Sequence, residues 1–118
     1  MEVITLSKDT EIKITAKQTI HELYNSLKTY PDQNKTLTDI TDVLMQVYKK
    51  LDTAPNPEAL VNRLANYIYV AGFGNIHLNA ADEQRVIDLG ATGSKAGWNG
   101  RYMADFADKS QFFGIFDR

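Results

Sequence analysis

The chain has 118 residues, a formal net charge of −2 and no cysteine, with 43% hydrophobic and 24% charged residues. This length and composition predict one small globular domain and argue against an intrinsically disordered chain. The lack of cysteine excludes a disulfide framework and a thiolate metal site, and the lack of a basic stripe argues against nucleic acid as a partner.

Residues 1–14 form the least distinctive segment. They are rich in β-branched side chains around a turn-like "SKDT", and an acidic residue occupies position 2. The segment lacks the uninterrupted apolar core of a signal peptide. We therefore expect an N-terminal extension that is either disordered or folded as a short hairpin, which would have to dock on another element to be stable.

Two amphipathic helices are expected next. The first begins at Thr15, because Thr15 and Gln18 have the spacing of a capping box, and it ends before Pro31. Its apolar residues recur at helical spacing, namely Ile20, Leu23, Tyr24 and Leu27. The second follows the polar turn "DQNKT" and ends near "DTAPNP", with an apolar stripe formed by Leu37, Ile40, Val43, Leu44, Val47, Tyr48 and Leu51.

A third helix is predicted from Asn56 and Pro57, because asparagine is a good capping residue and proline is favoured at the first helical position. Between residues 60 and 73 few side chains are strongly polar, so this helix is expected to be the most buried one. Gly72 and Gly74 then break the pattern.

The fourth predicted helix has Asn79 as its cap, with Asp82 three positions later and Leu78 as a hydrophobic staple. Gly90 and Gly93 each disfavour a helix by about 1 kcal/mol relative to alanine, so the helix is expected to fray or end near them. The residues expected on its inward face are Val86, Ile87 and Leu89.

These patterns predict an all-α fold, an antiparallel up-down four-helix bundle over residues 15–95, because short connections make successive helices antiparallel. Residues 96–118 follow as a C-terminal tail. The longest apolar run, "YIYVAGFG", has about eight residues, far fewer than the ~20 needed to span a bilayer. We therefore expect a cytoplasmic protein without stable membrane insertion.

Candidate metal ligands and catalytic groups are sparse. His21 begins "HELYN", which is not the zinc motif HExxH because Asn25 stands where a second histidine is required. His77 lies in a loop between apolar residues, and two histidines on separate elements make a weak metal site. We interpret both as structural or solvated, and we expect no cofactor and no bound metal.

The acidic pairs and the glycines also have structural explanations. Asp82 and Glu83 stand at a helix start, where the helix dipole favours acids. Two further carboxylates lie three residues apart in the tail without a nucleophile–base pair, and "GFGN" lacks the third glycine of a dinucleotide-binding motif. Tyr67 and Tyr69 are interpreted as packing residues. No enzyme motif is present, so the chain is not expected to be an enzyme.

The tail, "GWNGRYMADFADKSQFFGIFDR", differs from the helical sequence before it. Its large aromatic side chains would each bury about 150–250 Å² when packed, whereas ordering the segment costs about 1–2 kcal/mol per residue. Because the free energy gained by burying these side chains is comparable to the entropic cost of ordering the segment, we expect a partly structured tail. Trp98 and Tyr102 are expected to dock on the bundle, while residues 112–118 stay looser.

Three stretches, "KQTIHELYNSL", "LVNRLANYIYVAGF" and "AGWNGRYMADFADKSQF", together resemble the immunity proteins of class IIa, or pediocin-like, bacteriocins, and the enterocin A type in particular. The resemblance covers roughly residues 16–112, and the tail pattern is its most specific part. It implies an antiparallel four-helix bundle with a structured C-terminal tail, no enzymatic activity and no cofactor. Residues 1–14 and "FGIFDR" lie outside it.

The resemblance further implies that the protein protects its producer from a pore-forming peptide. It would act from the cytoplasm, with transient association with the membrane, on the complex of that peptide with the membrane components of the mannose phosphotransferase permease. A monomer is expected. Carried over by position, the implied partner-recognition residues are Trp98, Asn99, Arg101, Tyr102, Asp105, Lys109, Gln111 and Phe112.

Two other functions remain open from the residues alone. A cytoplasmic helical adaptor or antitoxin could bind a soluble partner through the same tail. A metal-dependent enzyme built on a four-helix bundle would need inward Glu and His ligands, and the third predicted helix has neither after Glu58.

Overall fold

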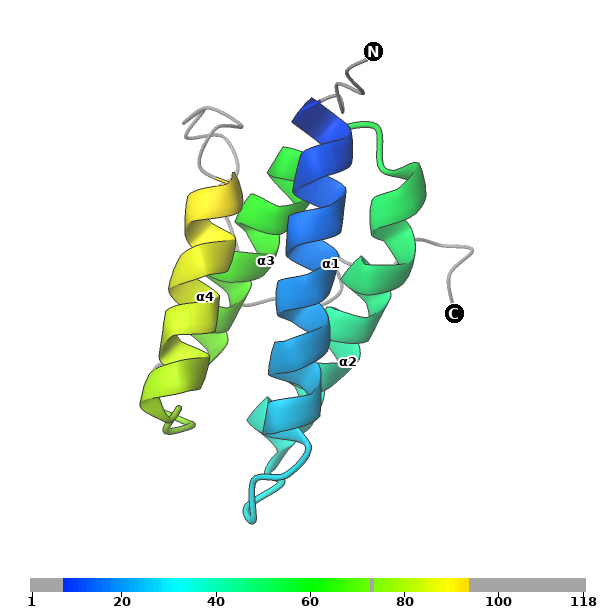
Figure 1. Ribbon diagram of the computed structural model, residues 1–118. Helices are drawn as coiled ribbons and strands as arrows, with labels where there is room; N and C mark the ends of the chain where they lie inside the picture. The colour runs from blue at the N-terminus through cyan, green and yellow to red at the C-terminus, as the bar shows by residue number, and fades with distance from the viewer. Residues whose placement is uncertain (1–7, 73, 94–118) are drawn as a thin grey trace.

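The computed structural model describes residues 8–72 and 74–93. Within them it confirms the all-α prediction. The helices are α1 (Lys8–Leu27), α2 (Lys35–Lys50), α3 (Pro57–Gly72) and α4 (Ala80–Gly93), and a short 3-10 turn, η1 (Leu51–Thr53), follows α2. Figure 1 shows successive helices running in opposite directions, with α1 beside α2 and α4, and α3 beside the same two helices.

The start of α1 differs from the prediction. The helix begins at Lys8, so the predicted start at Thr15 is wrong, and residues 8–14 form neither a hairpin nor a disordered extension. Ile12 and Ala16 are both buried and continue the apolar face one further turn toward the N-terminus. Burial of this face outweighs the β preference of the local sequence, because helix and strand propensities are weak compared with packing. Residues 1–7 lie outside the described part of the chain.

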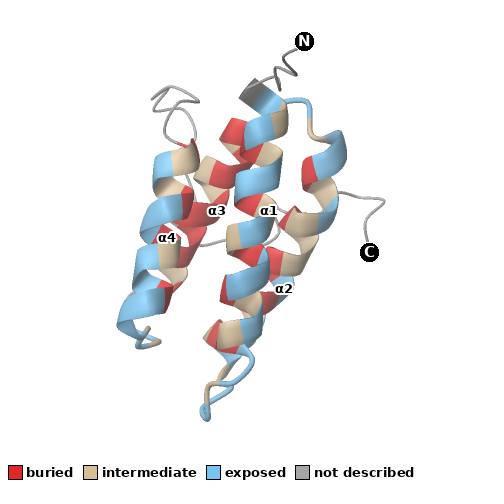
Figure 2. Cartoon of the chain, in the orientation of Figure 1, coloured by how far each residue is buried: buried red, intermediate tan, exposed pale blue. Residues whose placement is uncertain are grey.

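The core lies between the four helices, and Figure 2 shows the buried residues concentrated on their facing sides. The predicted stripe of α2 is confirmed, except that Tyr48 is only half-buried. In α3, Tyr67 is buried, whereas Tyr69 on the same helix is 47% exposed. The stripe residues of α2 and the buried residues of α3 thus form one continuous apolar cluster with those of α1 and α4.

Asparagine side chains cap three of the helices. Asn56 Oδ1 accepts a hydrogen bond from Ala59 N at 3.1 Å, and Asn79 Oδ1 accepts one from Asp82 N at 2.8 Å, which confirms both predicted caps. Asn34 caps α2 in the same way, through Leu37 N at 2.9 Å. Each cap satisfies a backbone N–H that has no partner inside its helix.

The link between α3 and α4 turns at Gly74, which has a φ of +75°. The carbonyl of Gly72 accepts hydrogen bonds from Asn75 N at 2.9 Å and Ile76 N at 3.1 Å. A left-handed conformation after a helix end is typical of glycine, since it has no Cβ to clash. The predicted break at these glycines is therefore confirmed, and it returns the chain toward α4.

One prediction for α4 is wrong and another is confirmed. Val86 and Leu89 face the core as expected, but Ile87 is 46% exposed, because adjacent helical residues point about 100° apart. The helix continues through Gly90 and ends at Gly93, which confirms the predicted end near these glycines. A Cβ on Gly93 would lie 2.5 Å from Asn62 N, so this glycine lets α4 approach the backbone of α3. The close contact compensates for the low helix propensity of glycine.

Two lysines of α1 contact η1 at the end of the bundle where α2 connects to α3. Lys17 Nζ lies 3.1 Å from both carboxylate oxygens of Asp52 and 4.7 Å from the centre of the Tyr48 ring. Lys13 Nζ donates to the Asp52 carbonyl at 3.1 Å. These contacts join α1 to η1. They are exposed, so each is expected to contribute at most about 1 kcal/mol.

We predict opposite effects for alanine at the two glycines of α4. In Gly93→Ala the new Cβ would meet backbone atoms of Asn62 at 2.5 and 2.7 Å, so the helices must separate and the free energy of unfolding should fall by about 1–3 kcal/mol. In the control Gly90→Ala the nearest atom is Ala65 Cβ at 3.9 Å, an ordinary contact, so stability should stay equal or rise by up to about 1 kcal/mol. Urea unfolding measures both, and equal stability of the two variants would contradict the close approach.

Candidate functional site at the loop end

The predicted recognition residues of the tail lie outside the described residues. The last residue that the structure describes is Gly93. The predicted recognition residues are Trp98, Asn99, Arg101, Tyr102, Asp105, Lys109, Gln111 and Phe112. The site that the structure does show is at the end of the bundle where α1 connects to α2 and α3 connects to α4. We call it the loop end; Figure 1 shows both connections at this end.

A buried carboxylate organises the loop end. The Asp82 side chain, in the first turn of α4, has no exposed surface. Its Oδ2 accepts hydrogen bonds from Ser26 Oγ and from Tyr30 Oη, each at 2.6 Å. Its Oδ1 accepts one from Arg85 Nη1, also at 2.6 Å. A buried charge is costly unless it is paired and hydrogen-bonded, and here both oxygens have donors.

The network joins three segments of the chain. Ser26 is in the last turn of α1, Tyr30 is in the α1–α2 connection, and Asp82 and Arg85 are in α4. The Tyr30 hydroxyl also accepts a hydrogen bond from Asn79 N at 3.0 Å, so it serves as donor and acceptor at once. Arg85 Nε lies 3.5 Å from Glu22 Oε1 on α1. Together these contacts hold the start of α4 against the end of α1.

The network shifts the pKa of two of its members. Burial raises the pKa of the Tyr30 hydroxyl above its ordinary value of 10.0, and the hydrogen bond to Asp82 raises it further. The hydrogen bond with Asp82 raises the pKa of the Arg85 guanidinium, which therefore stays charged. Both shifts favour the protonated donors that the Asp82 carboxylate needs.

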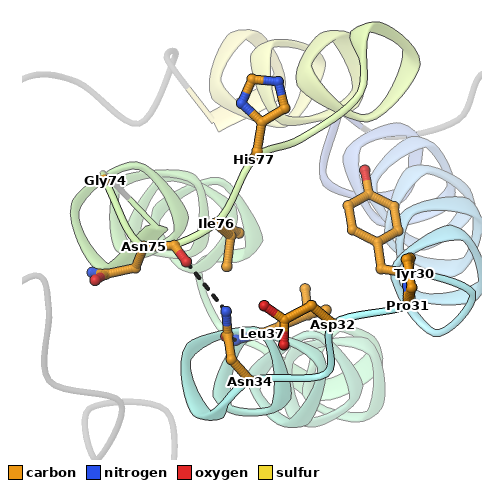
Figure 3. A pocket seen from close by; sticks show the side chains of 9 residues that line it. All are labelled: Tyr30, Pro31, Asp32, Asn34, Leu37, Gly74, Asn75, Ile76 and His77. Carbon is orange, nitrogen blue, oxygen red and sulfur yellow. Dashed lines mark hydrogen bonds between the residues drawn. The ribbon is translucent and has the colours of Figure 1, made fainter.

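Beside this network lies a cleft of about 520 Å³, which we call the loop cleft (Figure 3). The hydrogen bond from Asn34 Nδ2 to the Asn75 carbonyl, at 3.2 Å, links its two sides. Figure 3 shows Asp32 and Ile76 directed into the space between the two connections. The lining residues are Tyr30, Pro31, Asp32, Asn34, Leu37, Gly74, Asn75, Ile76 and His77.

A second cleft, of about 240 Å³, neighbours the loop cleft; we call it the α3–α4 cleft. It shares Gly74, Ile76 and His77 with the loop cleft. Its carboxylate is Glu83, and its wall includes the half-exposed Tyr69. The full set of lining residues is Ile68, Tyr69, Gly72, Gly74, Ile76, His77, Leu78, Glu83 and Val86.

The other candidates from the sequence have surface positions. His21 Nε2 lies 3.2 Å from Asn25 Nδ2 on the exposed side of α1, and His77 is exposed at the rim of both clefts. Within residues 8–72 and 74–93, no group of three or more His, Cys, Asp or Glu residues could hold a metal ion. The two clefts can therefore offer apolar contact, hydrogen bonds and single carboxylates, which suits binding of a partner segment.

Only part of this site could be predicted from the sequence. The spacing of Asn79 and Asp82 indicated a helix start, and both residues do act there. It did not indicate that Asp82 is fully buried, because its hydroxyl donors, Ser26 and Tyr30, are 56 and 52 residues away. The spacing of Asp82 and Arg85, an acid in the first turn of a helix with an arginine at i+3, could have indicated an ion pair.

Replacing Asp82 by asparagine should destabilise the fold. An amide presents an NH₂ group where the carboxylate accepts hydrogen bonds, and it leaves the Arg85 guanidinium without a counter-charge. We expect the free energy of unfolding to fall by about 2–4 kcal/mol in Asp82→Asn. Asp88→Asn on the same helix is the control, since Asp88 is exposed and its Oδ1 accepts a hydrogen bond from the exposed Gln84 side chain at 3.0 Å. A fall in the free energy of unfolding of less than about 0.5 kcal/mol in Asp82→Asn would show that the hydrogen bonds of Asp82 do not stabilise the fold.

Tyr30 should give stability a dependence on alkaline pH. Because its folded pKa is raised, its contribution is complete below the unfolded value of about 10 and is lost as pH rises through the folded pKa. Tyr30→Phe should be less stable than the wild type by about 1–2 kcal/mol at neutral pH, and this difference should shrink above pH 10. Urea unfolding from pH 7 to pH 11 measures the difference, and a constant difference would contradict the shift.

Comparison with known proteins places this fold in a family. No helix among the described residues combines the length and the apolar character needed to cross a membrane. A family model described as "Bacteriocin immunity protein family" matches residues 14–94. No solved structure gave a significant match.

Two curated relatives are similar over most of their length. The probable leucocin-A immunity protein of Leuconostoc gelidum is 57% identical over 81 residues, which is 68% of this chain and 72% of the relative. The probable mesentericin-Y105 immunity protein of Leuconostoc mesenteroides is 54% identical over 82 residues, 69% of this chain and 73% of the relative. The chain belongs to the bacteriocin immunity protein family.

Proposed function

We propose that this protein protects a bacteriocin-producing cell from a pediocin-like, pore-forming bacteriocin. The observation that carries the proposal is the family match over residues 14–94, which spans α1 from its middle to the end of α4. The names of the two relatives, which refer to leucocin A and mesentericin Y105, support the same class of bacteriocin. The protein acts as a binding partner and is not an enzyme.

The proposed mechanism operates from the cytoplasm. The protein engages the complex that the bacteriocin forms with the membrane components of the mannose phosphotransferase permease, and it blocks the pore while associating transiently with the membrane. The resemblance of the tail to this class of immunity proteins supports this mechanism. A helical bundle with surface clefts suits recognition of a partner that is itself embedded in the membrane.

The proposed recognition surface is the tail. Its residues are those carried over by resemblance, Trp98, Asn99, Arg101, Tyr102, Asp105, Lys109, Gln111 and Phe112. Aromatic residues and arginine dominate the energetics of protein interfaces, because they combine a large apolar area with directional hydrogen bonds. Gly97 and Gly100 allow the backbone turns that such a surface requires.

The test is survival of bacteriocin-sensitive cells that express this chain. The cells are challenged from outside with a panel of pediocin-like peptides that includes leucocin A and mesentericin Y105. We expect protection against one or a few peptides of the panel. Protection should be lost when the chain is truncated after Ala96 and in the full-length double variant Arg101→Ala/Lys109→Ala. It should persist in Lys49→Ala, a control at an exposed lysine of α2.

Circular dichroism and urea unfolding of the same variants separate recognition from folding. The tail variants should keep most of their helical signal, because the described helices end at Gly93. Full protection by the truncated chain would show that the tail is not the recognition surface. A folded wild-type chain that protects against no peptide, and that binds a soluble partner instead, would favour a cytoplasmic adaptor or antitoxin.

A further inference from the structure

We propose that the loop end is a second recognition surface, which binds a segment of a partner protein that carries apolar side chains flanked by lysine or arginine. This inference rests on the proposed function and assigns to it a site other than the tail. The loop cleft and the α3–α4 cleft share residues 74, 76 and 77, so the two clefts are neighbours and together make up this surface.

The floor of this surface is apolar and held in place. Leu37 is buried in the core, and Ile76 packs against the core from the loop. The Tyr30 ring lines the loop cleft while its hydroxyl is fixed by Asp82 and Asn79 at 2.6 and 3.0 Å. A partner side chain can therefore bury apolar area here without first ordering the floor, which lowers the entropic cost of binding.

The charges around the floor favour a cation. Each cleft has one carboxylate in its lining, Asp32 in the loop cleft and Glu83 in the α3–α4 cleft. Both residues are exposed, and within the described part of the chain neither carboxylate group accepts a hydrogen bond or forms an ion pair. The neighbouring cation Lys35 is paired with Asp39 at 3.0 Å, and Arg85 is paired with Asp82. Lys28, at the end of α1, lies over the Tyr24 ring instead.

The proposed cellular partner has the matching chemistry. The cytoplasmic loops of membrane proteins carry an excess of lysine and arginine close to the ends of their apolar spans. Such a loop presents cations beside apolar side chains, which is what the two carboxylates and the apolar floor would accept. We therefore infer that the loop end contacts a basic cytoplasmic loop of the membrane receptor, while the tail supplies a separate contact.

Binding of a defined peptide to the full-length chain tests the surface directly. The probe is a short acetylated and amidated peptide with two leucines, each flanked by lysines, and the control peptide has glutamate at every lysine. In ¹H–¹⁵N spectra the basic peptide should shift the amides of residues 30–37 and 74–83, and salt should weaken the effect. Binding should be about tenfold weaker in Asp32→Lys/Glu83→Lys, because two attractions become repulsions.

Two further variants make the outcome decisive. Asp42→Lys changes the charge at an exposed carboxylate of α2 outside both clefts, and it should bind like the wild type. Asp32→Asn/Glu83→Gln removes the charges without placing a cation in the first turn of α4, and it should lose part of the affinity. Equal shifts with the acidic peptide, shifts confined to other residues, or unchanged binding by the lysine double variant would overturn the proposal.

The cell assay separates this inference from the proposed function. If wild-type chain protects and Asp32→Lys/Glu83→Lys does not, while Asp42→Lys does, the loop end takes part in immunity. If all three protect equally, the loop-end proposal is wrong and the proposed function stands. If wild-type chain binds the basic peptide as described but protects against no bacteriocin, the proposed function fails while the basic-segment site is retained with another partner.

Discussion

A carboxylate that is removed from water needs donors, and Asp82 obtains them from the end of α1, from the α1–α2 connection and from its own helix. Breaking any one of these contacts would leave a buried charge with too few partners, so the contacts are expected to form and fail together. The same contacts determine where the Tyr30 ring and the start of α4 lie. Both clefts of the loop end are therefore built on a single buried group.

The two ends of the bundle are held by different kinds of interaction. At the loop end the Asp82 carboxylate is fully buried, so its contacts are screened by salt less than those of an exposed pair. At the other end the Lys17–Asp52 pair is exposed, with 27% and 63% of the two side chains accessible, and is expected to contribute little. The bundle is thus more firmly fixed where it presents its clefts. A firm binding surface suits recognition of a partner, because less order has to be created on binding.

The sequence predicted the fold well where the signal was local and periodic. The stripe of α2 and the asparagine caps of α3 and α4 follow directly from spacing and from the side-chain chemistry of each position. The start of α1 was missed because Ile12 and Ile14 look like strand residues, and only the burial of Ile12 against other helices shows otherwise. Ile87 was assigned to the core from its apolar character alone. Its neighbour Val86 faces the core, and adjacent helical residues point about 100° apart, so Ile87 faces away from it.

The loop end was less predictable for a related reason. Its defining contacts join residues more than 50 positions apart, as between Asp82 and Tyr30, and one sequence does not reveal which distant side chains meet. The end of α4 near Gly93 was predicted from the low helix propensity of glycine, but the close approach of Gly93 to the backbone of Asn62 was not. The implied role of the tail came from resemblance to a family, and it concerns residues beyond those described.

The contact of Gly93 with Asn62 also fixes the place from which the rest of the chain departs. The 25 residues after Gly93 start at the end of α4 that is remote from the loop end. The 14 residues of α4 separate the two places by only about 21 Å, whereas a segment of that length can extend to roughly 80–90 Å. A partner held by the tail would therefore stay within reach of the loop end, and the second encounter would become intramolecular. Two individually weak contacts can then act as one strong attachment, through the high effective concentration that the shared chain imposes.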